Sequence, residues 1–365
     1  MSELKVGIVG TTRGADFYNN FNMFSNVNVK AVMDTDQESL AKFAEKYSID
    51  KTFQNYEDLL DYDIDVVVLT SPIHVHADQA ISALNKDIHV LSEVTAATSL
   101  EECKMLVEAA KRSKAQYMMA ENYCYIRENI AIKNMINEGL FGEIYFAEGE
   151  YIHDVKYLQY DEDGNPTWRK RDTMGKRGCI YGTHSLGPTL SWFSDRVKYV
   201  NCLGTGSYTS PENENDDTTI MLCRTENGGL IKIRLDLTSN RPHNMSYYTL
   251  QGTKGCYEAP RVPGEKHRVW LEDYCTSKHA WINLEDLFHE FLPKEYLNMP
   301  VEPKDSNHWG SDYYMIKDFI DCIMNEKPVT IDIYKALQFT LPGILSEESI
   351  NSGGSQVEVP DIKQW

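Results

Sequence analysis

The chain has 365 residues, of which 42% are hydrophobic and 25% are charged. These values are ordinary for a folded globular protein and argue against a disordered chain, a collagen-like repeat or a coiled coil. The 55 acidic residues outnumber the 36 basic residues, which gives a net charge of −19. Because a protein this acidic repels phosphate groups, we expect neither nucleic acid nor an anionic membrane surface as a partner.

Apolar runs such as residues 66–69 are far shorter than the roughly 20 residues that a transmembrane helix needs. The eight cysteines are scattered, and none forms a Cys-x-x-Cys pair. The N-terminus shows no basic segment followed by an apolar stretch. We therefore expect reduced thiols, no bound metal, no membrane span, no signal peptide and a cytoplasmic location.

The first third of the sequence alternates between strand and helix patterns. Five apolar runs predict strands, at residues 4–9, 27–33, 64–69, 88–91 and 116–120. Between them, Thr35 with Glu38 and Ser99 with Glu102 are typical of capping boxes at helix starts, and residues 76–85 read as another helix. Strands separated by helices form parallel βαβ units. We therefore predict a dinucleotide-binding domain of the Rossmann type, with a doubly wound parallel sheet, over residues 1–122.

The pattern changes after residue 122. A predicted helix over 128–137 is followed by runs rich in Tyr, Thr, Ile and Val, at 143–153, 198–206, 217–225, 229–238, 245–252 and 255–259. Gly228-Gly229 lies between two of these runs and favours a hairpin. Helical patterns return at 311–325 and 334–350, after an expected surface loop over 293–303. We predict an α+β domain over residues 123–365, with an open, mainly antiparallel sheet that serves substrate binding and oligomerisation.

The first strand leads directly into Gly10-Thr11-Thr12-Arg13-Gly14. A tight glycine turn before a helix presents backbone N–H groups to a pyrophosphate. Asp34 ends the next strand, and its carboxylate can accept hydrogen bonds from a ribose diol and would repel a 2′-phosphate. The turn and Asp34 together predict NAD as the cofactor, in preference to NADP. The alternative for Asp34 is a helix-cap or turn residue.

Two further strand ends in this domain carry residues suited to a cofactor. Ligands of open parallel sheets bind beyond the carboxyl ends of the strands. The candidate cofactor contacts at these ends are Ser71, Pro72, His74, His76, Glu93 and Val94. The alternative for either histidine is a residue that begins a helix without touching a ligand.

The turn at Gly10, Ser71-Pro72 with a nearby histidine, Glu93 and the string at 137–144 resemble the Gfo/Idh/MocA oxidoreductase superfamily. Within it, the sequence is most similar to the NAD-dependent glycosidases typified by bacterial α-N-acetylgalactosaminidases. Strings shared with that branch lie at 93–94, 118–122, 147–154, 183–188, 251–255 and 342–347. The resemblance covers essentially the whole chain and implies a Rossmann domain joined to a domain with an open, mainly antiparallel sheet.

The resemblance also implies roles for individual residues. In the glycosidase branch the residue matching Asn122 contacts the cofactor, and those matching Tyr151, Arg169, Tyr181 and His184 line the sugar site. Thr183 and His153 belong to the same shared strings, and we include them among the substrate-binding candidates.

Two positions depart from the patterns of these relatives. Val94 stands where the superfamily commonly has a lysine with a catalytic role. Gly182 stands where the glycosidase branch has a proline.

Tyr181 and His184 are the strongest catalytic candidates, because a Gly-Thr turn at a helix start can direct both side chains into one cavity. Hydride transfer from a sugar carbon needs a base for the hydroxyl proton, and histidine side chains titrate near neutral pH. Tyrosine can relay a proton or hold a neighbouring hydroxyl. The alternative is a helix-capping His184 and a core-packing Tyr181.

The residues around these candidates add binding groups. Side chains alternate along a strand, so Tyr151 and His153 are expected to share a face. Arg169 belongs to the basic segment Trp168-Arg169-Lys170-Arg171 and is predicted to bind sugar hydroxyl, acetamido or carboxylate groups. The other basic residues of that segment are expected to be solvated.

We therefore predict an NAD-dependent carbohydrate oxidoreductase that exchanges a hydride with a sugar ring hydroxyl at C3, with the His184 imidazole close to the nicotinamide. One alternative is a glycoside hydrolase that uses transient C3 oxidation and elimination. Another is a non-catalytic NAD-binding sensor. A homo-oligomer, either a dimer or a tetramer, is expected.

Overall fold

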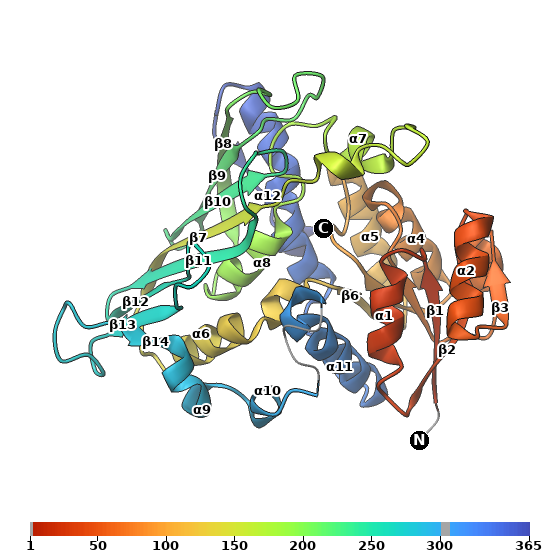
Figure 1. Cartoon of the computed structure of the whole chain (residues 1–365), viewed down its shortest axis with the longest axis horizontal. Coiled ribbons are helices and arrows are strands. Elements are labelled where there is room, and N and C mark those ends of the chain that lie inside the picture. Colours follow the sequence, from red (N-terminus) through yellow and green to blue (C-terminus); the bar gives the residue numbers. More distant parts are fainter. Residues whose placement is uncertain (1–2, 301–306) are drawn as a thin grey trace. The chain divides into compact units, whose positions relative to one another are not determined.

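The computed structural model of the chain describes residues 3–300 and 307–365 (Figure 1). The chain divides into two compact units. The first comprises residues 1–121, 303–337 and 362–365, and the second comprises 122–302 and 338–361. A single boundary between residues 122 and 123 does not describe this division, because two later segments return to the first unit.

The first unit is built on a six-stranded sheet with the order β3-β2-β1-β4-β5-β6, in which neighbouring strands pair in parallel. Its strands are β1 (Leu4–Val9), β2 (Val27–Met33), β3 (Lys51–Phe53), β4 (Val66–Leu69), β5 (His89–Ser92) and β6 (Tyr117–Met119). The predicted doubly wound parallel sheet is confirmed. The strand order reverses between β1 and β4, which is the point where such sheets form a ligand crevice.

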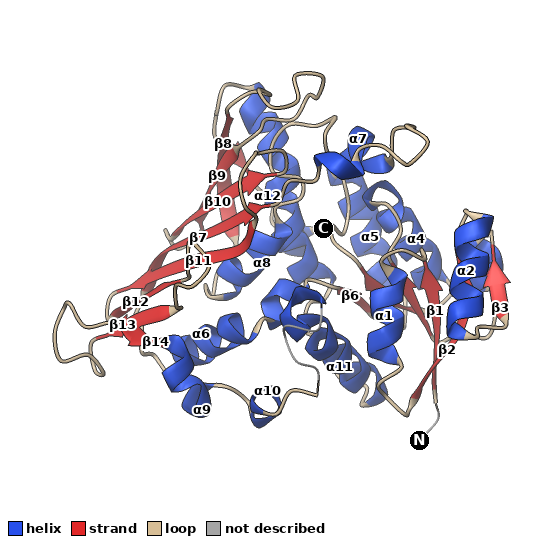
Figure 2. Ribbon diagram, viewed as in Figure 1, coloured by secondary structure: helices blue, strands red, loops and turns tan. Residues whose placement is uncertain are grey.

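Helices lie on both faces of this sheet (Figure 2). They are α1 (Gly14–Phe21), α2 (Gln37–Tyr47), α3 (Tyr56–Leu60), α4 (His76–Asn85), α5 (Leu100–Arg112) and α11 (Ser311–Met324). Because both faces are covered, all four residues of β4 are fully buried.

The two predicted capping boxes have different outcomes. Ser99 and Glu102 form the predicted box at the start of α5, with each side chain accepting a bond from the other's backbone N–H. The predicted Thr35–Glu38 box is wrong, because α2 is capped instead by Asp36, whose carboxylate accepts a bond of 2.7 Å from the Ser39 N–H.

The described part of the later segment, residues 307–337, joins the rest of the first unit through backbone hydrogen bonds and helix packing. The Met119 N–H donates to the Ile331 carbonyl at 3.0 Å, which satisfies a donor on the edge strand β6. The Gln116 side chain bonds to the backbones of Lys327 and Val329 in the same segment. α11 packs against α1.

The second unit contains a nine-stranded sheet with the order β14-β13-β12-β11-β7-β10-β9-β8-β15. Its strands are β7 (Ile144–Ile152), β8 (Val197–Gly204), β9 (Thr219–Thr225), β10 (Leu230–Asp236), β11 (Asn244–Gly252), β12 (Gly255–Glu258), β13 (Arg268–Leu271), β14 (Ile282–Asn283) and β15 (Val357–Glu358). Neighbours pair antiparallel except for β7 and β10. The predicted mainly antiparallel sheet and the hairpin at Gly228-Gly229, between β9 and β10, are confirmed.

Helices of the second unit gather on one face of this sheet, and the other face is open (Figure 2). The helices are α6 (Arg127–Asn137), α7 (Trp168–Asp172), α8 (Thr183–Ser191), α9 (Phe288–Phe291), α10 (Lys294–Leu297) and α12 (Ile333–Asn351), the first turn of which belongs to the first unit. The open face carries exposed apolar side chains such as Leu203 and Leu222.

The surface loop predicted over residues 293–303 contains the short helix α10, and its last three residues lie outside the described part of the chain. Among the residues that are described, no helix combines the length and the apolar character that crossing a membrane requires.

The N-terminal end of α8 lies directly on β7. A Cβ atom at Gly149 would come within 2.7 Å of the Ser185 carbonyl oxygen and 3.0 Å of the Ser185 Cβ. The Tyr248 hydroxyl, from β11, donates a bond of 2.6 Å to the His184 carbonyl oxygen in the same turn. Glycine at position 149 therefore sets how closely α8 approaches the sheet.

Replacing this glycine should disturb the contact. We expect Gly149→Ala to lower the free energy of unfolding by about 1–3 kcal/mol, because the added methyl group overpacks the interface. Urea denaturation followed by circular dichroism measures the effect. Tyr145→Ala, at an exposed site on the same strand, is the control and should cost less. Equal stability of Gly149→Ala and the parent protein would contradict this description.

Candidate active site

The turn after β1 fits a bound dinucleotide in its backbone geometry. Gly10 has a φ of +89°, and a Cβ there would come within 2.8 Å of the Thr70 carbonyl oxygen at the end of β4. Gly14 begins α1, and a Cβ there would lie 2.7 Å from the Ile8 side chain. These glycines let the chain pass between the ends of β1 and β4 and lead into a helix N-terminus, which is the form of cradle that a pyrophosphate requires.

The Asp34 carboxylate ties this turn to the end of β2. One oxygen accepts bonds from the Thr11 N–H (2.8 Å) and the Thr11 hydroxyl (2.7 Å), and the other accepts from the Asp36 N–H (3.0 Å). These are the bonds of a turn residue, the alternative weighed above. Because a carboxylate accepts about four hydrogen bonds, one position remains for a ribose hydroxyl.

The Arg13 side chain bonds to carboxylates within its own unit. It donates to Glu93 at 2.6 Å, to Asp16 at 2.9 Å and to both oxygens of Asp312 at 2.8 and 3.0 Å. Arg13 and Glu93 were both predicted as cofactor contacts, yet their charged groups bind each other. No sequence pattern indicated Asp312, which lies on α11, about 300 residues after Arg13 in the chain.

Burial and charge oppose each other at this ion cluster. Burial favours a raised pKa for Asp312, but Arg13 and His308 outweigh it and hold the pKa of that carboxyl well below its usual range. Burial likewise lowers the pKa of Arg13, and Glu93 and Asp312 raise it by more. The cluster is therefore charged at neutral pH and fixes the turn to the end of β5 and to α11.

The cofactor contacts predicted at the strand ends differ in burial. His76 is 1% exposed, and its ring nitrogens lie 2.9 Å from the Thr95 carbonyl oxygen and 2.7 Å from that of Ser71. Burial lowers the pKa of His76, so the ring is neutral at neutral pH and its single N–H donates to one of these two carbonyl oxygens. His74 is exposed, whereas Val94 is 2% exposed and donates its N–H to the Glu93 carboxylate at 3.0 Å.

The remaining cofactor candidates differ in exposure. Thr12 is exposed at the tip of the turn, and Pro72 precedes the short helical turn Ile73–Val75. Asn122 is buried and is the first residue of the second unit.

In the second unit the structure brings the predicted catalytic and sugar-site residues into one aromatic cluster. The His184 ring stacks on Tyr123 with centroids 4.2 Å apart, and it lies 5.2 Å from the Tyr151 ring and 5.5 Å from the Tyr181 ring. The rings come from β7, from the N-terminal end of α8 and from the segments preceding α6 and α8. His184 is 6% exposed, so its imidazole is largely shielded from water.

His153 directly follows β7, two residues after Tyr151, and its side chain contacts this cluster. Its Nδ1 lies 2.9 Å from the Tyr151 hydroxyl, and its ring lies 4.7 Å from that of His243. Burial, followed by the proximity of His243, His184 and Arg169, lowers the pKa of His153 to about 4. The neutral imidazole can then accept a bond from the Tyr151 hydroxyl and fix its orientation. The sequence analysis missed His243, which follows a turn and has no periodic pattern around it.

Tyr151, His153 and Tyr181 border a pocket with an empty volume of about 380 Å³, and His184 contacts two of these rings without being one of the lining residues. The lining residues are Tyr151, His153, Val155, Leu158, Trp168, Arg169, Thr173, Tyr181 and Leu237. The Arg169 guanidinium lies over the Trp168 ring at 4.4 Å from its centroid. Thr183, predicted to bind substrate, is 1% exposed and is not one of the lining residues.

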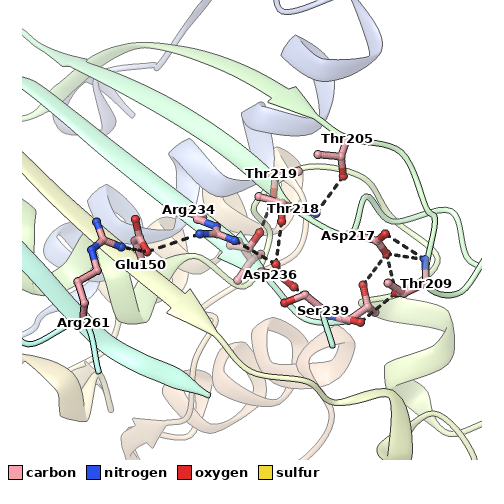
Figure 3. Close-up of polar contacts among 12 residues, drawn as sticks. Glu150, Thr205, Thr209, Asp217, Thr218, Thr219, Arg234, Asp236, Ser239 and Arg261 are labelled. Carbon is pink, nitrogen blue, oxygen red and sulfur yellow. Dashed lines mark hydrogen bonds and ion pairs between the residues drawn. The ribbon is translucent and has the colours of Figure 1, made fainter. Parts of the chain in front are cut away.

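Buried carboxylates order the turn that follows β10, and Figure 3 shows their polar contacts. Asp236, at the end of β10, accepts bonds from the Thr218 hydroxyl (2.7 Å) and the Ser239 N–H (2.8 Å). The backbone beyond β10 stays paired with the chain after β7, through a bond of 2.9 Å from the Val155 N–H to the Leu237 carbonyl oxygen. The polar turn thus holds the apolar side chain of Leu237 at the pocket.

Within the described ranges, no group of three or more His, Cys, Asp and Glu side chains is arranged to hold a metal ion. The polar side chains that line the pocket carry phenol, imidazole, guanidinium and hydroxyl groups.

Three family models match the chain. The model described as the oxidoreductase family with an NAD-binding Rossmann fold matches residues 4–121. The GFO/IDH/MocA C-terminal domain matches residues 130–258, and the C-terminal domain of glycosyl hydrolase 109 matches residues 196–365.

Known relatives match over nearly the whole chain. A glycosyl hydrolase family 109 protein from Shewanella pealeana is 29% identical, over 99% of this chain and 86% of its own. An α-N-acetylgalactosaminidase from Shewanella oneidensis is 28% identical, over 99% of this chain and 85% of its own.

Solved structures share the fold. Levoglucosan dehydrogenase in complex with NADH superimposes with a TM-score of 0.84 at 20% identity and covers 99% of this chain and 100% of its own. The WlbA dehydrogenase from Bordetella pertussis, in complex with NADH and UDP-GlcNAcA, has a TM-score of 0.79 at 18% identity, over 98% of each chain.

The Arg13 cluster makes stability depend on pH. A carboxyl whose pKa is lowered by folding stabilises the protein fully above its unfolded pKa of about 3.9, and this contribution is lost as the pH falls from about 5 toward the folded value. We expect Asp312→Asn to cost about 2–3 kcal/mol at pH 7 and progressively less below pH 4.

Thermal unfolding between pH 7 and pH 3.5 checks this expectation. Asp63→Asn removes a surface carboxylate that pairs with Lys5 and Lys30, and serves as the matched control with little effect. A difference between Asp312→Asn and the parent that stays constant over this pH range would count against the cluster.

Proposed function

The chain belongs to the Gfo/Idh/MocA oxidoreductase superfamily, and we propose that it is an NAD-dependent enzyme that exchanges a hydride with a ring hydroxyl of a sugar or glycoside, at C3. The observation that carries this proposal is the cluster of Tyr151, Tyr181 and His184 beside a pocket that also presents Arg169. Such a set can bind hydroxyl groups and move a proton.

NAD is the cofactor, and when bound it supplies the hydride donor or acceptor. The backbone between Gly10 and Gly14 would hold its pyrophosphate, and the free position on the Asp34 carboxylate would bind a ribose hydroxyl. Ser71, His74 and Asn122 remain proposed contacts to the cofactor.

Side chains of the protein would transfer the proton and orient the sugar. We assign to His184 the proton of the reacting hydroxyl, because its imidazole is shielded from water and adjoins both tyrosine rings. Tyr181 would orient the sugar, and Tyr151 would do so with its hydroxyl held by His153. Val94 offers no proton-transfer group where the wider superfamily commonly has lysine, so we assign the proton to this cluster.

A redox-assisted glycoside hydrolase is the second candidate. It is favoured by the match of residues 196–365 to the glycosyl hydrolase 109 C-terminal domain. In that reaction, oxidation of C3 to a ketone acidifies the C2 hydrogen, the C1 substituent is eliminated, water adds and C3 is reduced again. The same binding groups would serve, and no net oxidation would result.

We further propose a cytoplasmic homo-oligomer. The eight free cysteines suit a reducing compartment. The open face of the nine-stranded sheet, with Leu203 and Leu222 exposed, would be the subunit interface.

The two enzymatic candidates differ in their products. The enzyme is incubated with aryl glycosides and, separately, with free sugars and NAD⁺. Release of the aryl group without net NADH supports the hydrolase, and net NADH from a free sugar supports the dehydrogenase. Neither product over a broad panel of sugars and both anomers would contradict the proposed function.

The role of His184 is testable by substitution. We expect His184→Ala to lower the rate by about two orders of magnitude or more, because the reacting hydroxyl loses its base. NAD binding and thermal stability are measured alongside, to separate chemistry from folding. His279→Ala, at an exposed site, should leave the rate unchanged. Unchanged turnover in His184→Ala would favour the non-catalytic sensor.

Cofactor selectivity tests Asp34. We expect Asp34→Ala to reduce the preference for NAD over NADP, because the carboxylate that repels a 2′-phosphate is gone. The measured quantity is the ratio of the two dissociation constants. Asp36→Ala removes the neighbouring carboxylate, which caps α2, and should cost about 1 kcal/mol of stability without changing that ratio. The same ratio in Asp34→Ala and the parent would refute the assignment.

A further inference from the structure

A second cavity adjoins the pocket that holds Arg169 and Tyr181. The two share Thr173 and Leu237 as lining residues. The second cavity has an empty volume of about 250 Å³, and its remaining lining residues are Lys176, Gly178, Ile180, Asn215, Asp216, Thr219 and Leu235. A ligand group that reaches Thr173 in the first pocket therefore also borders the second cavity.

Buried polar atoms border this second cavity without a partner. Thr173 is 5% exposed and Asn215 is 7% exposed. Neither the Thr173 hydroxyl nor the Asn215 Oδ1 has a hydrogen-bond partner in the described part of the chain. Because leaving a buried hydroxyl unsatisfied costs about 1–3 kcal/mol, the Thr173 hydroxyl points to a ligand group that accepts its hydrogen bond. The Asn215 Oδ1 is an acceptor and instead requires a donor, such as a sugar hydroxyl.

Two cations line the pair of pockets without an acidic partner. Arg169 lies against the Trp168 ring, and neither it nor Lys176 forms an ion pair with any described residue. Their basic neighbours are engaged elsewhere: Lys170 bonds to Asn213, and Arg177 donates two bonds of 2.9 Å to Asp216. In a chain with a net charge of −19, this is a local reversal of sign.

The carboxylate that lines the second cavity, Asp216, and its neighbour Asp217 are bonded to groups other than Arg169 and Lys176. Asp216 accepts the two Arg177 bonds and a third of 2.6 Å from the Gly206 N–H. Asp217 accepts a bond from the Thr209 hydroxyl, as Figure 3 shows, and another from the Thr238 hydroxyl. His153 is neutral, because its pKa is lowered to about 4. The pockets therefore carry a net positive charge.

We propose that Arg169, Lys176 and Thr173 recognise an anionic substituent of the saccharide, so that the substrate class is an acidic sugar or an acidic glycoside. This inference rests on the proposed function and names its substrate. Guanidinium and ammonium groups form their strongest hydrogen bonds with carboxylate, sulfate and phosphate oxygens. The Thr173 hydroxyl supplies a neutral donor between the two charges, and its unmet hydrogen bond is then satisfied.

Binding to the NAD-loaded enzyme tests the inference without requiring turnover. Isothermal titration calorimetry compares methyl glycosides of neutral hexoses with the corresponding uronic acids, 6-sulfates and 6-phosphates. We expect at least one anionic series to bind about tenfold more tightly or better, which corresponds to about 1.4 kcal/mol. The carboxylate, sulfate and phosphate arms identify the group. Equal affinity for the neutral and all anionic ligands would overturn the inference.

Substitutions then test whether an anionic ligand is recognised by Lys176 itself or by the overall positive charge of the segment. Lys176→Gln should lose about tenfold in affinity for the anionic ligand and keep its affinity for the neutral one. Lys176→Arg should retain most of the preference. Arg171→Gln is the matched control, because Arg171 lies in the same segment, is exposed and lines neither pocket. An equal loss in Arg171→Gln and Lys176→Gln would overturn the assignment.

The outcomes distinguish this inference from the proposed function. Turnover of neutral sugars without any preference for anionic ones would contradict the inference alone. Preferred binding of anionic sugars without hydride exchange on any of them would contradict the proposed function alone. Absence of binding to every saccharide tested would contradict both.

Discussion

The close approach of α8 to β7 at Gly149 is the constraint on which the candidate sugar site depends. Ser185 packs on the glycine backbone, so the residue before it, His184, is held beside Tyr151, two positions further along β7. The bond from Tyr248 to the His184 carbonyl fixes the same turn from a third element. A larger residue at position 149 would separate the helix from the strand, and the imidazole and the phenol would no longer share one cluster.

A different interaction organises the nucleotide end. The glycine turn supplies the backbone geometry for a cofactor, whereas the charged side chains around it are occupied with one another. Arg13 links the turn to Glu93 and to Asp312, and the charges compensate at a site where an isolated ion would be costly to bury. Asp312, on α11, thus holds a turn whose candidate cofactor motif lies in the first third of the chain.

The sequence predicts what depends on local pattern. Hydrophobic periodicity is sufficient to place most strands and helices, and the chain order of strand and helix predicts the parallel sheet. Contacts over long distances carry no such pattern: Asp312 reaches Arg13 across the chain, and His243 reaches His153 from a neighbouring turn. The parallel pairing of β7 with β10 also cannot be predicted from local pattern, because hairpins join only strands that follow one another in the chain. The Thr35–Glu38 box failed because Asp36, an equally good cap, lies one residue later.

The positive pockets and the aromatic cluster together define what this site can recognise. The rings of Tyr151, Tyr181 and His184 suit a sugar ring and its hydroxyls, and the basic segment around α7 adds charge to one side of it. The family models and the NADH-bound neighbours support the fold and the cofactor, whereas the proposed chemistry depends on these particular side chains.

The central claim is that a sugar ring carbon gives up its hydrogen during the reaction. Single-turnover kinetics with a substrate deuterated at C3 test it most directly, since they isolate the chemical step from product release. The account predicts that the deuterated sugar reacts several times more slowly than the ordinary one. Identical single-turnover rates for the two substrates would contradict it.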